Sequence, residues 1–434
     1  MTTRLKTADN HFADAFATFL TAKRDNEADV NDTVTTILAD VRARGDAAVV
    51  ELTRRFDGFE LSTDGMAIGA DEIDAAMKQC DPALLAALEL AAERISDFHK
   101  RQIPEDLDYA DAAGIRLGYR WTAVAAAGLY VPGGTAAYPS SVLMNALPAK
   151  VAGVERLVMV VPTPGGVLNP LVLAAARVAG IDEIYRIGGA QAVGALAYGT
   201  ATIAPVDKIV GPGNAYVAAA KRQVFGTVGI DMIAGPSEIL VVADADNDPN
   251  WIAMDLLSQA EHDKLAQAIL ITDDEGFAER VAAAVEGALK TLPRADIAGQ
   301  SWRDFGALIV VGNLDEAIPL IDRIAPEHLE LAVADPDRLA ARVCNAGAIF
   351  LGRYAPEALG DYLAGPNHVL PTDGSARFSS GLGVLDFLKR SSLIGADAES
   401  LATVGPAAVL LAEAEGLDAH ARSIALRLNR RSEE

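Results

Sequence analysis

The sequence predicts an α/β protein built on parallel sheets, and three observations support this fold class. After Tyr130, short runs of β-branched and apolar residues alternate with alanine-rich helical stretches, which is typical of strands joined by crossover helices. Clusters of glycine and proline stand where these runs end. The chain before Tyr130 instead shows long helical patterning, most clearly over residues 31–55 and 71–101.

The predicted strands are short and bounded by turn residues. They cover residues 157–161, 183–187, 208–210, 239–243, 268–272, 308–311, 329–333 and 348–351. Turns follow at residues 162–166, Gly188-Gly189, Gly211-Pro212-Gly213 and Gly235-Pro236. Ligands of open parallel sheets bind beyond the carboxyl ends of the strands, so we expect the functional site at these glycine-rich joints.

A weak internal repeat suggests two related half-sheets. The repeated order is a strand, a loop, a helix and a second strand. It occurs once with Asn169-Pro170 at the start of the helix, and again with Asp248-Pro249 in that position. Any α/β protein repeats this order of elements, so the sequence does not decide whether the two half-sheets arose by duplication. After Phe387 the pattern is helical again, which indicates a separate C-terminal element.

Composition narrows the classes of function. The formal net charge is −23, and a field of that sign repels phosphate backbones, so nucleic-acid binding is not expected. No apolar stretch reaches the ~18 residues that suggest a membrane span. The N-terminus lacks the basic-then-apolar order of a signal peptide, and we expect a cytoplasmic protein.

The two cysteines, Cys80 and Cys344, lie far apart and outside any CxxC spacing. A structural disulfide or a thiolate zinc site is therefore not expected, and the simplest interpretation is two incidental thiols. Any metal would be bound by histidine, carboxylate or amide oxygen.

Gln259 and His262 are the first candidate metal ligands. Asp248 and Pro249 have the residue types of a helix N-cap and first turn. The helix that they begin would carry Gln259 and His262 three residues apart on one face. Taken alone, however, two polar residues near a helix end more often face water than a metal.

Among the six histidines, four lie near acidic residues or glycine-rich breaks. These are His262, His328, His368 and His420. Glu327 and His328 are adjacent, and such a pair can supply two proton-transfer groups of different basicity. On a regular strand their side chains would point to opposite faces. Both could therefore serve one cleft only if Pro326 marks an irregular loop, and a pair on the surface remains the alternative.

The glycine-rich joints could bind an anion or a nucleotide through exposed backbone amides, or they could be simple turns. No GxGxxG motif with a downstream acidic residue occurs, and neither a Walker A motif nor a GxSxG nucleophile elbow is present. An ordinary dinucleotide fold is therefore not indicated by motif.

Taken together, these segments resemble the histidinol dehydrogenase family. The run from Ile230 through Gly235-Pro236-Ser237-Glu238 to Ser258-Gln259-Ala260-Glu261-His262 matches the signature of that family. Further matches extend over nearly the whole chain. They are Tyr130-Val131-Pro132-Gly133-Gly134, Gly189-Ala190-Gln191, Gly211-Pro212-Gly213-Asn214, Pro326-Glu327-His328, Gly360-Asp361-Tyr362, Gly365-Pro366-Asn367-His368, Phe378-Ser379-Ser380-Gly381-Leu382 and Glu415-Gly416-Leu417-Asp418-Ala419-His420.

The resemblance implies the last step of histidine biosynthesis, in which L-histidinol is oxidised through L-histidinal to L-histidine while two NAD+ are reduced. It implies His328 as the general base and Glu327 as the group that activates water. The implied zinc ligands are Gln259, His262, Asp361 and His420. The implied NAD contacts are Tyr130, Gln191 and Asn214. The implied substrate contacts are Ser237, Gln259, His262, His328, Asp361, Glu415 and His420.

The resemblance also implies an architecture of two incomplete Rossmann-like, parallel-sheet domains with a helical N-terminal segment and a C-terminal helical dimerisation arm. Residues 1–26 would form the N-terminal segment. Residues 27–129 and 239–381 would form the substrate and metal domain, and residues 130–238 the NAD-contacting domain. The arm, residues 382–434, would reach into the active site of a partner subunit, so that Glu415 and His420 act across the interface of a homodimer.

Three other functions fit these residues less well. A zinc hydrolase that uses Glu327 with a metal-bound water leaves the joints at Tyr130, Gln191 and Asn214 without a purpose. An inactive scaffold should have lost a metal or base residue, and none is missing. A paralogue that oxidises another amino- or sulfo-alcohol should differ first at Ser237 and Glu415, and both match. Neither cysteine lies in a motif, which disfavours a thiohemiacetal route.

Overall fold

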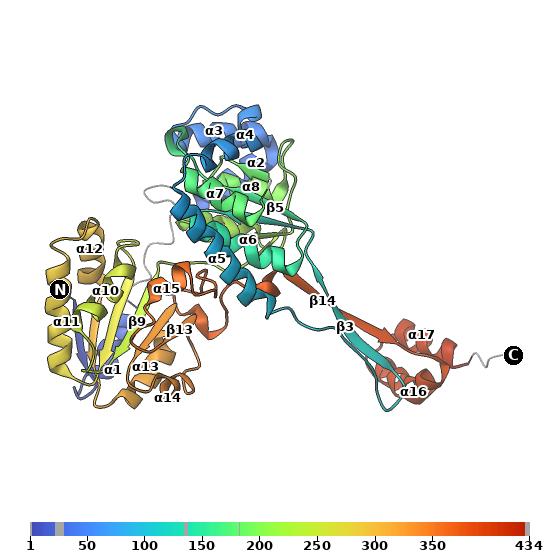
Figure 1. The fold of residues 1–434 in the computed structure, drawn as a ribbon. Helices are drawn as coiled ribbons and strands as arrows, with labels where there is room; N and C mark the ends of the chain where they lie inside the picture. Colours follow the sequence, from blue (N-terminus) through green and yellow to red (C-terminus); the bar gives the residue numbers. More distant parts are fainter. Residues whose placement is uncertain (1, 22–29, 134–137, 182, 430–434) are drawn as a thin grey trace. The chain divides into compact units, whose positions relative to one another are not determined.

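The structure is a computed structural model that describes residues 2–21, 30–133, 138–181 and 183–429. The chain forms two compact units. Unit 1 comprises Met1–Arg101 and Ala125–Phe387, and unit 2 comprises Gln102–Val124 and Leu388–Glu434. Figure 1 shows the elements of both units.

The larger sheet of unit 1 has six strands in the order β1-β11-β10-β9-β12-β13, all parallel. Its strands are β1 (Thr3–Lys6), β9 (Glu238–Ala243), β10 (Gln267–Thr272), β11 (Ala307–Val310), β12 (His328–Ala332) and β13 (Ala348–Leu351). Apolar cores lie on both faces, with Leu240 and Val242 in one and Ile239 and Val241 in the other. Burial on both faces explains why these strands are nearly continuous apolar runs.

Helices cover both faces of this sheet. One face is packed by α1 (Phe12–Thr21), α13 (Ala317–Ile324) and α14 (Pro336–Ala340). The other face is packed by α10 (Pro249–Ala260), α11 (Glu275–Ala288) and α12 (Ala295–Phe305). A short helix, α15 (Glu357–Tyr362), follows β13.

The smaller sheet of unit 1 has five parallel strands in the order β6-β5-β4-β7-β8. They are β4 (Ala126–Tyr130), β5 (Arg156–Val160), β6 (Glu183–Tyr185), β7 (Lys208–Val210) and β8 (Gly229–Ile230). The connecting helices are α6 (Pro139–Ala152), α7 (Pro170–Ala179), α8 (Gly189–Tyr198) and α9 (Ala215–Val224). Helices α2 (Val30–Arg44) and α3 (Asp46–Asp57) share a core with this sheet.

The remaining elements of unit 1 are α4 (Ala70–Met77), α5 (Pro82–Lys100) and short 3₁₀ helices at Thr63–Gly65, Pro164–Gly166, Leu314–Glu316, Ser375–Arg377 and Val384–Phe387. Each predicted strand is present, and the α/β fold with parallel sheets is confirmed. The expected division at residues 27, 130, 239 and 382 stays a prediction, and residues 22–29 around the first of these boundaries lie outside the described residues.

Unit 2 combines an antiparallel sheet with two helices. Its strands, in the order β14-β3-β2, are β2 (Leu107–Ala110), β3 (Arg116–Ala123) and β14 (Leu388–Gly395). Its helices are α16 (Ala398–Ala414) and α17 (Asp418–Leu428). Figure 1 shows β3 and β14 running side by side. In neither unit is any described helix long and apolar enough to cross a membrane.

Five strands correct the helical interpretation of these parts of the chain: β1, β2, β3 and β4 lie in the first 130 residues, where only helix was expected, and β14 begins the C-terminal element that was expected to be helical. In β1 only Leu5 is buried, and β2 and β14 have no buried residue. Such strands lack the alternation of buried and exposed residues that marks a strand in a sequence. These strands pair with segments that are distant in the chain, so no local sequence pattern indicates their hydrogen bonds.

Candidate metal and catalytic site

Glu327 and His328 lie at the amino end of β12, where the chain is irregular. Ala325, with a left-handed φ of 48°, ends α13, and the chain bends at Glu327 before the strand begins. His328 Nδ1 lies 2.9 Å from the carbonyl oxygen of Glu238, and Glu327 Oε2 accepts the N–H of Glu238 at 2.9 Å. Both side chains therefore contact one residue of β9, as an irregular loop at Pro326 would allow.

The hydrogen bond of His328 fixes which ring nitrogen is free. A carbonyl oxygen only accepts, so Nδ1 carries the proton, and the lone pair of the neutral ring lies on Nε2. Nε2 has no hydrogen-bond partner among the described residues. Burial lowers the pKa of His328 to about 4, so the ring is neutral at pH 7. Burial also raises the pKa of Glu327 well above its ordinary value.

A cluster of acids and histidines lies beside His328 Nε2. His328, Glu357 and Asp361 each offer one ligand atom, and these atoms lie within 4.8 Å of one another. His328 Nε2 is 3.8 Å from Glu357 Oε1, and Asp361 Oδ1 is 3.5 Å from His368 Nδ1. Ser258 donates to the second oxygen of Glu357 at 3.2 Å.

The two acids of this cluster have opposite pKa shifts. Burial, together with the charge of Asp361, raises the pKa of Glu357 to about 9. Burial alone would also raise the pKa of Asp361, but the His368 hydrogen bond and the nearby His328 and His262 rings outweigh burial. The pKa of Asp361 is lowered to about 2. One proton is thus held on Glu357, while Asp361 stays an anion.

Gln259 lies in the last turn of α10, the helix that Asp248 caps as expected, but His262 follows the C-cap residue Glu261 and lies outside the helix, so the two residues do not share a helix face as expected. Gln259 is 1% exposed, so it does not face water, and its Oε1 has no hydrogen-bond partner among the described residues. His262 is exposed, and its ring is close enough to Asp361 to lower the pKa of that carboxyl.

The donor set fits a divalent cation that prefers nitrogen and oxygen ligands. In the described part of the chain, Gln259 Oε1, His328 Nε2 and Glu357 Oε1 are buried without a partner. Fifteen buried side-chain atoms of the described residues have no hydrogen-bond partner, and these three are the ones that could serve a ligand or ion beside Asp361. An amide, imidazoles and carboxylates are ligands that zinc accepts. Zinc itself remains a prediction.

Glu357 was not anticipated from the sequence. It is 2% exposed although it follows Pro356 at the start of a short helix, where an acidic residue usually caps a solvated end. A signal did exist, because Glu357 precedes Asp361 by four residues and therefore shares its helix face. His368 ends a glycine-rich break in the sequence, and the family resemblance implies no role for it.

The position of this cluster corrects one expectation. Ligand sites were expected at the carboxyl ends of strands, yet His328 begins β12, and Ser237 precedes the first residue of β9. The carbonyl of Ser237 accepts the N–H of Gln267, the first residue of β10. The cluster thus lies at the amino edge of the six-stranded sheet.

The joints expected to contact NAD lie at the carboxyl edge of the five-stranded sheet. Tyr130 ends β4, and its hydroxyl accepts the N–H of Gly189, the first residue of α8. Burial raises the pKa of Tyr130 to about 12. Gln191 is buried in the first turn of α8, and Asn214 caps α9 by accepting the N–H groups of Tyr216 and Val217. Gly134, the last residue of the first joint, lies outside the described residues.

Glu415 and His420 belong to unit 2 and are both exposed. Glu415 caps the C-terminal end of α16, and His420 lies in the first turn of α17. Unit 1 therefore holds Gln259, His262 and Asp361 of the expected zinc ligands, and unit 2 holds the fourth. The two cysteines are free thiols, Cys80 half-buried and Cys344 exposed, in line with the prediction of no disulfide.

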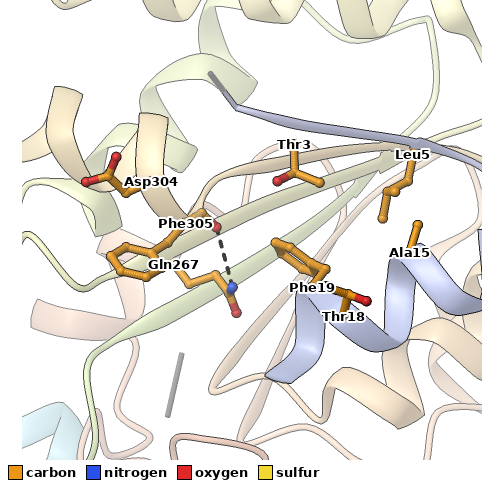
Figure 2. Close-up of a pocket in the computed structure, with 8 residues that line it drawn as sticks. All are labelled: Thr3, Leu5, Ala15, Thr18, Phe19, Gln267, Asp304 and Phe305. Atoms are coloured by element: carbon orange, nitrogen blue, oxygen red, sulfur yellow. Dashed lines mark hydrogen bonds between the residues drawn. The ribbon is translucent and has the colours of Figure 1, made fainter. Parts of the chain in front are cut away.

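A separate cavity of about 340 Å³ opens near the amino ends of β1 and β10. Figure 2 shows its lining side chains, with Gln267 donating to the carbonyl of Phe305. They are Thr3, Leu5, Ala15, Thr18, Phe19, Gln267, Asp304 and Phe305. None of the expected site residues lines this cavity, and we assign it no role in catalysis.

Comparison with known proteins agrees with the resemblance seen in the motifs. The family model described as histidinol dehydrogenase matches residues 20–428. The chain is 69% identical to the histidinol dehydrogenase of Rhodospirillum rubrum over 99% of both chains, and 65% identical to that of Rhizobium meliloti over 99% of both. The crystal structure of histidinol dehydrogenase from Elizabethkingia anophelis is 35% identical, covers 98% of each chain and superposes with a TM-score of 0.93.

Proposed function

The chain belongs to the histidinol dehydrogenase family, and we propose that it oxidises L-histidinol to L-histidine, with L-histidinal as intermediate, in the last step of histidine biosynthesis. The first oxidation converts the primary alcohol to the aldehyde, and hydride passes to one NAD+. Water then adds to the aldehyde, and the hydrate gives a second hydride to another NAD+ and becomes the carboxylate. The observation that carries the proposal is the free, neutral Nε2 of His328 beside a nitrogen and oxygen ligand cluster.

His328 would act as the general base in both oxidations. Its Nδ1–H is committed to the Glu238 carbonyl, so Nε2 is the atom that can take the alcohol proton as hydride leaves. A ring that stays neutral at pH 7 can accept this proton.

Glu327 would activate the water that hydrates the aldehyde. Burial raises the pKa of this carboxyl, which makes its ionised form a stronger base than an exposed glutamate. Its contact with the Glu238 N–H holds it 3.6 Å from the ring of His328. In this proposal the two groups act in turn on the same carbon of the substrate.

The proposed zinc ligands are Gln259, His262, Asp361 and His420. When bound, the metal would hold the imidazole and amine nitrogens of the substrate and so position its alcohol. Ser237 and Glu415 are proposed to contact the polar ends of the substrate. Tyr130, Gln191 and Asn214 are proposed to contact NAD, because they share one sheet edge with the N-terminal ends of α8 and α9, which favour phosphate.

We further propose a homodimer in which the partner subunit supplies Glu415 and His420. Unit 2 supports this because several of its large apolar side chains are exposed. Ile394 is 79% exposed, and Leu410, Leu411 and Leu426 are each more than 60% exposed. Clustered exposed apolar residues mark protein interfaces, and cyclic dimers are the commonest assemblies.

The decisive experiment measures stoichiometry. Zinc-loaded protein with excess NAD+ and a limiting amount of L-histidinol should release two NADH per histidinol, and L-histidine should be the product. One NADH per histidinol would mean that the protein catalyses only the first oxidation, from the alcohol to the aldehyde. No NADH at all, with activity towards another amino-alcohol, would favour the paralogue.

A further inference from the structure

Lys221 and Asp231 form a buried ion pair outside the residues assigned so far. Lys221 lies on α9, and Asp231 directly follows β8. Their side chains are 3% and 1% exposed. Burying two charges costs desolvation energy that the attraction between them often fails to offset, so a buried pair is weak evidence for a purely stabilising role.

Both members of the pair hold the same glycine. The N–H of Gly211 donates to Asp231 Oδ2 at 2.8 Å, and Lys221 Nζ donates to the carbonyl oxygen of Gly211 at 2.9 Å. The pair thus binds the donor and the acceptor of Gly211 at once. This fixes the direction in which the chain leaves β7.

Gly211 opens the joint that leads to Asn214. Its φ is +111°, and a Cβ placed on it would lie 2.1 Å from the carbonyl oxygen of Tyr130, so the joint packs directly against the last residue of β4. Asn214 caps α9, the helix that carries Lys221. The pair and the cap therefore hold the joint at its two ends.

We infer that Lys221 and Asp231 are positioning residues for the dinucleotide: they hold the Gly211–Asn214 joint in the shape that presents its backbone and Asn214 to NAD. The inference rests on the proposed function, because it takes this joint as an NAD contact. Neither residue needs to touch NAD. Their effect would pass through the direction of the Gly211 peptide groups and through the distance between this joint and Tyr130.

The test compares two double variants of the zinc-loaded enzyme. Lys221→Met with Asp231→Asn removes both charges together, so no unpaired charge stays buried, and the asparagine can still accept the Gly211 N–H. The carbonyl of Gly211 loses its donor. We expect the KM for NAD+ to rise about tenfold, as the loss of one well-placed hydrogen bond would produce. The kcat at saturating NAD+ and the KM for L-histidinol should stay within about twofold.

A matched control breaks an ion pair at the other edge of the same sheet. Arg156 and Glu183 begin β5 and β6 and form a two-point ion pair at 2.8 Å. The control variant, Arg156→Met with Glu183→Gln, should lower the Tm without changing the KM for NAD+. A rise in that KM in both variants would overturn the inference, because it would show a general loss of sheet stability.

The remaining outcomes are also informative. An unchanged KM for NAD+ in the Lys221→Met, Asp231→Asn variant, with the wild type active, overturns the inference. If this variant does not fold, a second charge-free pair, Lys221→Leu with Asp231→Asn, gives the same test, because it also removes the donor to the Gly211 carbonyl without leaving an unpaired charge buried. A wild-type enzyme that releases no NADH from L-histidinol would refute the proposed function instead, and NADH titration of the folded variants would still measure the effect on dinucleotide binding.

Discussion

Asp255 offers a sharp quantitative prediction, because its environment penalises its charge. It lies on α10 one turn before Gln259, is mostly buried and accepts a hydrogen bond from the side chain of Glu330 on β12. Burial raises the pKa of Asp255 from 3.8 to about 6. Burial and the neighbouring Asp255 also raise the pKa of Glu330 well above its ordinary value. The pair links α10 to β12, and Glu330 also accepts the N–H of Glu357.

The substitution Asp255→Asn should therefore stabilise the metal-free protein at neutral pH. A raised folded-state pKa means that the folded protein binds more protons than the unfolded chain between pH 3.8 and about 6. Below pH 4 the Asp255 carboxyl is protonated, so the folded protein buries no charge there. The stability that this protonated form contributes is lost as the pH rises through 6. At 1.36 kcal/mol per pH unit, the loss above pH 6 is about 3 kcal/mol. Asparagine, which has no charge to bury, escapes this loss.

The assay is thermal unfolding of both proteins in chelator from pH 4 to 7. Since about 3 kcal/mol corresponds to roughly 3 °C for a chain of this length, the Tm of Asp255→Asn should exceed that of the wild type by about that amount at pH 7. The difference should vanish near pH 4. The exposed Asp273→Asn is the control and should show no pH-dependent difference. A Tm difference for Asp255→Asn that is the same at pH 4 and pH 7 would refute the reasoning.

Three further predictions concern the proposed site. His262→Asn should lower the bound zinc well below one ion per subunit, measured by metal analysis, whereas the exposed His11→Asn should not; unchanged zinc would remove His262 from the ligands. Glu327→Gln should slow NADH release from L-histidinal by about 10²–10⁴-fold and from L-histidinol much less, and an equal loss in both halves would contradict its role with water. An equal mixture of His420→Ala and His328→Ala proteins should regain about a quarter of wild-type activity, because half of the dimers are hybrids with one intact site; no recovery despite proven subunit exchange would argue against a shared site.

The parallel sheets could be predicted because their strands are buried on both faces. Runs such as Ile239 to Ala243 carry an apolar residue at each position, and the helix caps at Asn169 and Asp248 mark where the following helices begin. The strands β2, β3 and β14 could not be predicted, because their side chains are largely exposed and only pairing between distant segments defines them. A local sequence pattern therefore predicts a strand that is buried on both faces far better than an exposed strand that is defined only by its pairing.

The candidate site was predictable in residue type but not in geometry. Motif spacing drew attention to His328 and Asp361, yet it could not say that Glu357 lies within reach of both, because that contact depends on how the chain folds between β12 and α15. Nor could the sequence give the tautomer of His328, which is set by the backbone carbonyl of Glu238 on a neighbouring strand.

The two edges of the sheets suit ligands of opposite charge. In a parallel α/β sheet each crossover helix runs opposite to the strands, so helix N-termini gather at the carboxyl edge and helix C-termini at the amino edge. The partial positive charge at the starts of α8 and α9 favours the pyrophosphate of a dinucleotide near Tyr130 and Asn214. The partial negative charge at the end of α10, next to Gln259, favours a cation. The amino edge of the six-stranded sheet therefore suits a metal site, because a cation is attracted to the C-terminal end of a helix.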